Sequence, residues 1–428
     1  MMISPRVAIV AGCRTPFARA GTAFRDLTGV DLGKACVREL LERSEVDPGL
    51  VGSVVMGQVV PSVKAPNLAR EVGLGVGLPK SVPAYTVNRA CASANQAIAD
   101  VASSILMGHI EAGVAGGAES LSDVPVLHSK GMARVLAQAQ KARSLGARLS
   151  VLAKLRPRDL IPQTPAIAEP STGLTMGQSA EKMAKENGIT RAEQDAVALA
   201  SHRNGLAATE DGRLPEETCP VRLPPRYDVT IRADNLLRRN TSLEALGALK
   251  PVFDRRHGTV TAGNSSPLTD GAAAVVLMSE ERARAEGLPP IAFVKGWAVA
   301  AVDPGGQLLM GPALAVPKVL ERCGLELRDM DLVEMHEAFG AQVVSNIQAL
   351  ESETWAREKL GRSTPVGRVD RSRLNVCGGS IALGHPFGAT GARITTTLAH
   401  EMVRRDAKYG LISVCAQGGM GFAMVLER

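Results

Sequence analysis

Residues 84–120, AYTVNRACASANQAIADVASSILMGHIEAGVAGGAES, predict a strand, a turn, a helix and a second strand in direct succession. The apolar residues of the helical part recur at helical spacing and mark its buried face: Ala94, Ile98, Val101 and Ile105. Near the start of the chain, the β-branched run VAIVAG at residues 7–12 predicts another buried strand, and residues 31–41 predict an amphipathic helix. Strands that alternate with helices of this length indicate a layered α/β fold.

Residues 374–428 repeat this order, with a strand, a glycine-rich loop, a helix and further strands. In the predicted helix, Gly391, Ile394 and Leu398 mark the buried face. Both halves place a cysteine at a junction between strand and loop, and a Gly-Gly pair after a strand. This resemblance between the halves indicates a duplication.

The 428 residues are too many for one small core, so we expect two or three domains. Between the two halves lies a region rich in Pro and Arg with poorer periodicity, which we interpret as an inserted lobe over the active site. The expected divisions are the first part of the N-terminal half (1–120), the inserted lobe (121–246), the last part of the N-terminal half (247–284) and the C-terminal half (285–428).

One stretch of this lobe is strongly basic. Between Lys130 and Arg158 there are eight Lys and Arg residues with no Asp or Glu among them, and Leu and Val are interleaved. A basic amphipathic helix, or a pair of them, can lie on an anionic membrane surface or dock on a partner protein. A charged face that is simply solvated is the alternative.

The net charge of +6 and pI near 9.0 favour acidic partners: nucleic acid, an anionic membrane or a polyanionic small molecule. Nucleic acid is not expected, because the sequence has no zinc-finger spacing and no aromatic-rich RNA-binding motif. The seven cysteines are scattered without a CxxC pair, which predicts neither a disulfide framework nor a metal site. Without a secretory signal or a long apolar run, we expect a soluble protein of the cytoplasm.

The candidate chemistry begins at Cys91, which follows a predicted strand at the start of a helix. Unpaired N–H groups and the helix dipole favour a thiolate there, although most cysteines are small buried apolar residues. His385 lies among glycines that let backbone approach a ligand closely. A second histidine, His336, and a second cysteine, Cys415, at the end of the predicted strand LISV, make a purely structural role for this set less credible.

Four segments together resemble the thiolase superfamily: NRACASANQA (88–97), EMHEAFGAQ (334–342), GGSIALGHPFGATG (378–391) and CAQGGMG (415–421). The resemblance runs from RTPFARAGTAF (14–24) through GTVTAGNSSPLTDGAAAV (258–275) to the last strand, and so covers nearly the whole chain. It implies a thiolase fold of two duplicated βαβαβαββ halves in five layers, with an inserted loop domain. It also implies a homodimer or tetramer.

Within the superfamily, the chain is most similar to the degradative thiolases that cleave 3-ketoacyl-CoA, of the β-subunit type in trifunctional fatty-acid β-oxidation complexes. HEAF in place of NEAF and the basic insertion after AESLSDVP carry this likeness. It implies CoA-dependent cleavage to acetyl-CoA and an acyl-CoA two carbons shorter. It also implies a hydratase/3-hydroxyacyl-CoA dehydrogenase subunit as a partner, and the basic insertion adds contact with an anionic membrane as a further expectation.

By this resemblance, Cys91 is the nucleophile, His385 accepts its proton, and Cys415 is the general acid and base. One oxyanion hole uses His385 with a water held by His336; the other uses the backbone N–H groups of Cys91 and Gln417. Many thiolases have Gly at the position of Gln417.

The resemblance also assigns contacts with CoA or the acyl chain to Ser266, Met176, Phe339 and Arg238. CoA and 3-ketoacyl-CoA are then substrates, and no permanently bound cofactor is expected, since the chain has neither an opening GxGxxG unit nor a Walker A pattern. Cys377, in NVCGG, is either a third reactive thiol or a small buried residue.

Three other functions compete with the degradative thiolase. An acetoacetyl-CoA thiolase working in condensation would use the same residues. A ketoacyl synthase shares the fold, but a second catalytic cysteine argues against it. A non-catalytic scaffold or lipid-carrier subunit would have lost catalytic residues, whereas all four positions here hold competent groups.

Overall fold

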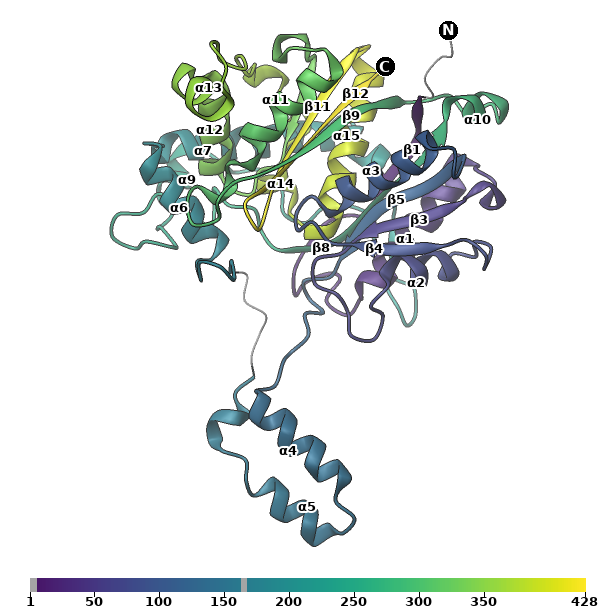
Figure 1. The fold of residues 1–428 in the computed structure, drawn as a ribbon, viewed down its shortest axis with the longest axis vertical. Helices are drawn as coiled ribbons and strands as arrows, with labels where there is room; N and C mark the ends of the chain where they lie inside the picture. The colour runs from purple at the N-terminus through teal and green to yellow at the C-terminus, as the bar shows by residue number, and fades with distance from the viewer. Residues whose placement is uncertain (1–5, 163–167) are drawn as a thin grey trace. The chain divides into compact units, whose positions relative to one another are not determined.

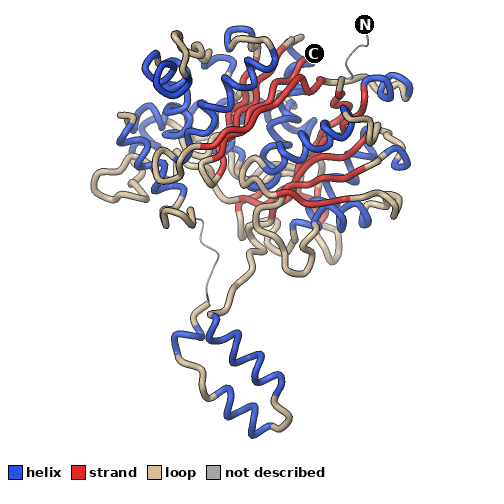
Figure 2. The backbone as a smooth tube through the Cα atoms, viewed as in Figure 1, coloured by secondary structure: helices blue, strands red, loops and turns tan. Residues whose placement is uncertain are grey.

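The computed structural model describes residues 6–162 and 168–428, which form two units (Figures 1 and 2). The main unit comprises the described residues up to 123 and from 168 onward. The second unit is formed by the residues between these two stretches in the sequence, 124–162.

A mixed sheet forms the centre of the main unit, with the strand order β10-β11-β12-β9-β1-β8-β5-β3-β4. The N-terminal half supplies β1 (Val7–Arg14), β3 (Ser53–Gly57), β4 (Ala84–Val87), β5 (Ala112–Glu119) and β8 (Thr269–Ser279). The C-terminal half supplies β9 (Ala292–Ala301), β10 (Leu332–Met335), β11 (Tyr409–Ala416) and β12 (Met420–Glu427). The short β2 (Ala18–Arg19) pairs with β8.

The two halves share one topology, which confirms the predicted duplication. In the N-terminal half the order from the centre outward is β1-β8-β5-β3, and in the C-terminal half the equivalent order is β9-β12-β11-β10. At the place equivalent to β4, the C-terminal half has only Leu374, which bridges in parallel to Val333 of β10. The halves join where β1 and β9 pair antiparallel, with Val7 opposite Val294.

Helices cover both faces of each half-sheet, giving five layers (Figure 1). On one outer side lie α1 (Gly29–Ser44), α2 (Leu68–Gly75) and α10 (Glu280–Ala285); on the other lie α11 (Gly311–Cys323) and α12 (Gly340–Glu351). The central layer holds α3 (Ser93–Leu106) and α15 (Thr390–Arg405), whose apolar faces pack into one core with strands of both halves. The central layer therefore carries one segment of each half toward the other.

Local sequence explains these elements. A capping box of Thr28 and Asp31 starts α1, which contains the helix predicted at residues 31–41. The four predicted apolar positions of α3 are all buried, as the helical spacing indicated. The run SVVMGQVV at residues 53–60 has the pattern of a strand, but β3 ends at Gly57, because the N–H groups of Val59 and Val60 donate to the side chain of Glu119 instead of to a neighbouring strand.

Between residues 168 and 268 the main unit continues as helices and loops. They include α6 (Met176–Glu186), α7 (Arg191–Glu210), α8 (Arg213–Glu217), α9 (Leu243–Gly247) and the small ribbon of β6 (Val221–Arg222) with β7 (Thr230–Ile231). Helix α7 packs against α12 and against the short α14 (Ser380–Leu383). A further helix, α13 (Glu353–Leu360), follows α12. Of the lobe predicted at residues 121–246, the part from 168 onward thus groups with the main unit.

The second unit is a pair of helices, α4 (Lys130–Lys141) and α5 (Leu145–Leu152), that contact each other. Ser129 and Ser144 cap their N-termini. No side chain of residues 124–162 is buried within the chain, and six leucines there are exposed: Leu127, Leu136, Leu145, Leu149, Leu152 and Leu160. Among the helices of the described residues, none has the length and apolar character needed to cross a membrane.

Candidate active site

Cys91 lies in a tight turn between β4 and α3. Ala90, directly before it, adopts a left-handed backbone with φ of 46°, which is uncommon for a residue with a side chain. The Asn88 side chain accepts from the Ala90 N–H, and the Ser93 hydroxyl donates to the Ala90 carbonyl. The turn thereby fixes Cys91 at the start of α3, a helix end that has no side-chain cap.

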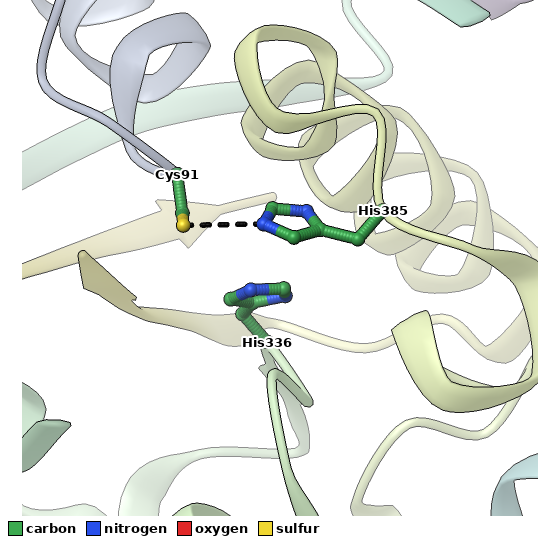
Figure 3. A group of neighbouring side chains, drawn as sticks. All are labelled: Cys91, His336 and His385. Atoms are coloured by element: carbon green, nitrogen blue, oxygen red, sulfur yellow. Dashed lines mark hydrogen bonds between the residues drawn. The ribbon is translucent and has the colours of Figure 1, made fainter. Parts of the chain in front are cut away.

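His385 faces Cys91, with 3.1 Å between its Nε2 and the Cys91 Sγ (Figure 3). Its Nδ1 lies 2.7 Å from the hydroxyl of Thr390, the first residue of α15. The backbone N–H of His385 donates to the carbonyl of Pro267, which anchors the loop to the C-terminal end of the segment GTVTAGNSSP. Thr390 lies within the motif GHPFGATG but was not predicted as a site residue.

Burial decides the charge state of this pair. It raises the pKa of Cys91 to about 12, although the backbone N–H groups of Gln417 and of Cys91 itself favour the thiolate. Burial, helped by the Arg393 cation, lowers the pKa of His385 to about 3. The resting pair is therefore a neutral thiol that donates to a neutral imidazole. The remaining imidazole proton, on Nδ1, is then donated to Thr390.

His336 follows β10 and lies beside His385, with ring centroids 4.2 Å apart and ring planes tilted by 45°. Its Nδ1 lies 2.9 Å from the Ser380 hydroxyl, while its buried Nε2 has no hydrogen-bond partner among the described residues. One ligand-type atom each from Cys91, His336 and His385 lies within 4.8 Å of the others. These residue types could hold zinc, but the 3.1 Å between thiol and imidazole is a hydrogen-bond distance, and the described chain brings no fourth ligand to the group.

Cys415 lies at the end of β11, in the same buried region. Burial, and then the neighbouring Cys91, raise its pKa well above the usual range. Two residues on, the Gln417 side chain donates to the Ala168 carbonyl at 3.0 Å, and the Gly418 N–H donates to Glu169 at 2.9 Å. The Gln417 side chain is thus engaged with the chain at 168–169, and its backbone N–H still acts on the Cys91 thiol.

The residues predicted to contact CoA fall into two groups. Phe339 and Met176 pack in the same apolar cluster as Cys415, and Ser266 donates its N–H to the carbonyl of Ala338. Arg238 lies elsewhere, in a pocket of the main unit that also has Arg19, His202, Gly263, Pro267 and Ile381 in its lining. This pocket adjoins Ser266 through the neighbouring Pro267.

Two buried carboxylates for which no role was predicted hold the loops of the site. Glu337 accepts from Ser201, from Asn375 and from the Ile381 N–H. Glu119 accepts from the N–H groups of Val59, Val60 and Gly388, and thereby ties the loop after His385 to the end of β3. Their sequence signal was their place: Glu119 ends a predicted strand, and Glu337 lies in the motif EMHEAFGAQ.

Cys377 lies apart from this group. The side chain of Cys377 is buried, and its Sγ lies 3.3 Å from Nη1 of Arg213. Burial raises the pKa of the Cys377 thiol. These surroundings are those of a small buried residue.

The site holds a thiol hydrogen-bonded to an imidazole, backbone N–H groups at the sulfur and a second buried thiol nearby. These groups are typical of an acyl-transfer enzyme that works through a thioester on cysteine. Two family models match the chain: "Thiolase, N-terminal domain" over residues 7–281 and "Thiolase, C-terminal domain" over residues 288–428. The chain belongs to the thiolase family.

Individual relatives agree with this. A 3-ketoacyl-CoA thiolase of Escherichia coli is 53% identical over 422 residues, which cover 99% of this chain and 97% of the relative. The structure of a Bacillus anthracis acetyl-CoA acetyltransferase matches with a TM-score of 0.84 at 35% identity, covering 99% of both chains. Human mitochondrial 3-ketoacyl-CoA thiolase matches with a TM-score of 0.81 at 35% identity, covering 99% of this chain and 98% of that one. The thiolase fold predicted from the sequence is confirmed.

Proposed function

We propose that this thiolase cleaves 3-ketoacyl-CoA with free CoA, giving acetyl-CoA and an acyl-CoA two carbons shorter, in fatty-acid β-oxidation. The contact of 3.1 Å between the Cys91 thiol and the His385 imidazole carries the proposal. The likeness to the E. coli 3-ketoacyl-CoA thiolase supports the choice of substrate. CoA acts as a substrate, and no bound cofactor takes part.

In the first half-reaction, the Cys91 sulfur attacks the C3 carbonyl and its proton passes to Nε2 of His385. The N–H groups of Cys91 and Gln417 stabilise the oxyanion that forms at C3. The C2–C3 bond then breaks, its electron pair stays on C2, and Cys415 donates its thiol proton to that carbon. Acetyl-CoA leaves, and the acyl group remains on Cys91 as a thioester.

In the second half-reaction, the Cys415 thiolate takes the proton of the incoming CoA thiol. The CoA sulfur attacks the acyl carbon, the bond to Cys91 breaks, and the Cys91 sulfur regains its proton from His385. The raised pKa of Cys415 suits its role as the proton donor to C2, because a thiol with a high pKa stays protonated until a strongly basic carbanion forms. Ping-pong kinetics follow from the covalent intermediate.

For CoA itself we propose the pocket of Arg238 and Arg19, whose cations suit the phosphates. Ser266 then lies beside the pantetheine arm, and Met176 and Phe339 line the path of the acyl chain toward Cys415.

The test is thiolysis of 3-ketoacyl-CoA substrates of four to sixteen carbons, followed by loss of the magnesium-enolate absorbance. The variants are Cys91→Ala and, as the matched control, Cys323→Ala, a half-buried cysteine outside the site. We expect activity toward long chains that Cys91→Ala abolishes and Cys323→Ala leaves unchanged. Activity on four carbons alone would instead indicate an acetoacetyl-CoA thiolase, the activity class of the B. anthracis match. No activity at any length would leave a non-catalytic subunit.

We also propose that the enzyme is a homodimer or tetramer of the cytoplasm, and that the basic helix pair of residues 124–162 contacts an anionic membrane or a hydratase/dehydrogenase subunit. The exposed leucines of the pair and its unbroken run of cations support this role. Reversal to Glu of Lys130, Arg134, Lys141 and Arg143 should reduce co-sedimentation with anionic vesicles or with the partner. Reversal of the exposed Arg255 and Arg256 of the main unit is the control. Equal binding by both variants would leave a solvated charged face.

A further inference from the structure

A buried chain of polar groups runs from Glu334 to His336. Glu334 lies 3.5 Å from Nη1 of Arg393, and Nη2 of Arg393 donates to the Ser380 hydroxyl at 3.2 Å. The same hydroxyl lies 2.9 Å from Nδ1 of His336. All four side chains are buried, with at most 3% of any of them exposed. None of the proton transfers of the proposed mechanism uses Glu334, Arg393 or Ser380.

The hydrogen-bond donor can be assigned for each contact between these polar groups. A guanidinium only donates, so the Ser380 oxygen must accept from Arg393. The single hydroxyl hydrogen of Ser380 then points away from the cation. Within residues 6–162 and 168–428, the other hydrogen-bond partner of this hydroxyl is Nδ1 of His336. If the oxygen also accepted from Nδ1, the hydroxyl hydrogen would have no acceptor among these residues, so Ser380 donates to Nδ1 and Nδ1 carries no hydrogen.

A neutral imidazole with a bare Nδ1 has its hydrogen on Nε2. His336 is neutral, because burial, His385 and Arg393 all lower its pKa. Its Nε2 is the atom left without a protein partner, and a ring nitrogen of His336 lies within 4.8 Å of the Cys91 sulfur. In the opposite tautomer, a lone pair at Nε2 would face the oxygen on which negative charge develops.

We infer that Ser380 and Arg393 are positioning residues, which hold His336 as the Nε2–H tautomer so that it donates a hydrogen bond toward the substrate's carbonyl oxygen. The catalytic part of this inference rests on the proposed thiolase function; the tautomer does not. The buried guanidinium orients the hydroxyl, the hydroxyl fixes the ring, and the ring supplies a neutral donor to the enolate of acetyl-CoA.

The direct test is nitrogen NMR of the full chain labelled with 15N-histidine, with the His336 signals assigned by their loss in His336→Asn. The variant is Ser380→Ala. The matched control is Ser345→Ala, which removes another buried hydroxyl, one without a hydrogen-bond partner in the described chain. We expect hydrogen on Nε2 in the wild type and in the control, and a mixture of tautomers, or hydrogen on Nδ1, in Ser380→Ala. Hydrogen on Nδ1 in the wild type, or an unchanged Ser380→Ala spectrum, would overturn the inference.

Kinetics test the consequence. Loss of one oxyanion donor lowers kcat by about 10²–10³-fold, so a donor that is only released from its orientation should lower kcat by about 10–100-fold with KM nearly unchanged. We expect this for Ser380→Ala and not for Ser345→Ala. Equal kcat in both would refute the positioning role. A wild type with hydrogen on Nε2 but no thiolysis would instead refute the proposed function and leave the tautomer assignment standing.

Discussion

Gly57, at the end of β3, packs directly against the start of α3, the helix that follows the nucleophile. A Cβ added there would lie 2.6 Å from the Cβ of Ser93 and 2.7 Å from the backbone nitrogen of Ala94. Ordinary contact begins at about 3.4 Å, so the start of α3 must move by about 0.8 Å. Cys91 precedes Ser93 by two residues, and a misplacement of this order lowers kcat by about 10²-fold. Overpacking should also lower the free energy of unfolding by about 1–3 kcal/mol.

The experiment compares Gly57→Ala with Gly73→Ala, a control in α2 on the same half-sheet. A Cβ at Gly73 would meet its nearest neighbours, Leu78 and Val54, at 3.8 Å, which is ordinary contact. We expect the control to keep wild-type kcat and stability in thiolysis and urea unfolding, and Gly57→Ala to lose about 10²-fold in kcat while still folding. If kcat of Gly57→Ala stayed within twofold of wild type, the packing of α3 against β3 would not be what positions Cys91.

Three further predictions concern the charge state and the support of the site. Because burial keeps the Cys91–His385 pair neutral, the ultraviolet difference between wild type and Cys91→Ala should show no thiolate between about pH 5 and about pH 9; a thiolate titrating in that range would contradict the neutral pair. Thr390→Val removes the acceptor of the His385 Nδ1–H and should lower kcat by about tenfold in the thiolysis assay, and an unchanged kcat would mean that the hydroxyl does not orient the ring. Asp234→Ala leaves the fully buried Arg14 short of an anion and should lower the free energy of unfolding in urea by about 3–5 kcal/mol; a loss below about 1 kcal/mol would show that the ion pair contributes little.

The fold could be predicted from the sequence because the hydrophobic periodicity of each strand and helix is contained in a short stretch of residues. Each half alternates strand and helix, and the glycine-rich loops mark where strands end, so the duplicated α/β order could be read directly. The end of β3 could not be read this way. Val59 and Val60 have the pattern of a strand, and only the approach of Glu119 from β5, about sixty residues on, draws their N–H groups out of the sheet.

The candidate site divides in the same manner. Cys91, His385, His336 and Cys415 lie in recognisable motifs. The structure brings the first three together and places Cys91 close enough to Cys415 to raise the pKa of Cys415. The buried residues that support these side chains could not be predicted from the sequence, as Arg393 shows. Arg393 lies on α15, where a charged side chain normally predicts a solvent-exposed position. It is buried because α15 lies between two half-sheets, which a single stretch of sequence does not reveal.

Acylation of Cys91 can be measured as the mass of the protein after mixing with a long-chain 3-ketoacyl-CoA in the absence of free CoA. Peptide mapping then locates any acyl group. We expect one acyl group per chain, two carbons shorter than the substrate chain and attached to Cys91, with one acetyl-CoA released. An unmodified protein, or an acyl group on Cys415, would contradict this expectation.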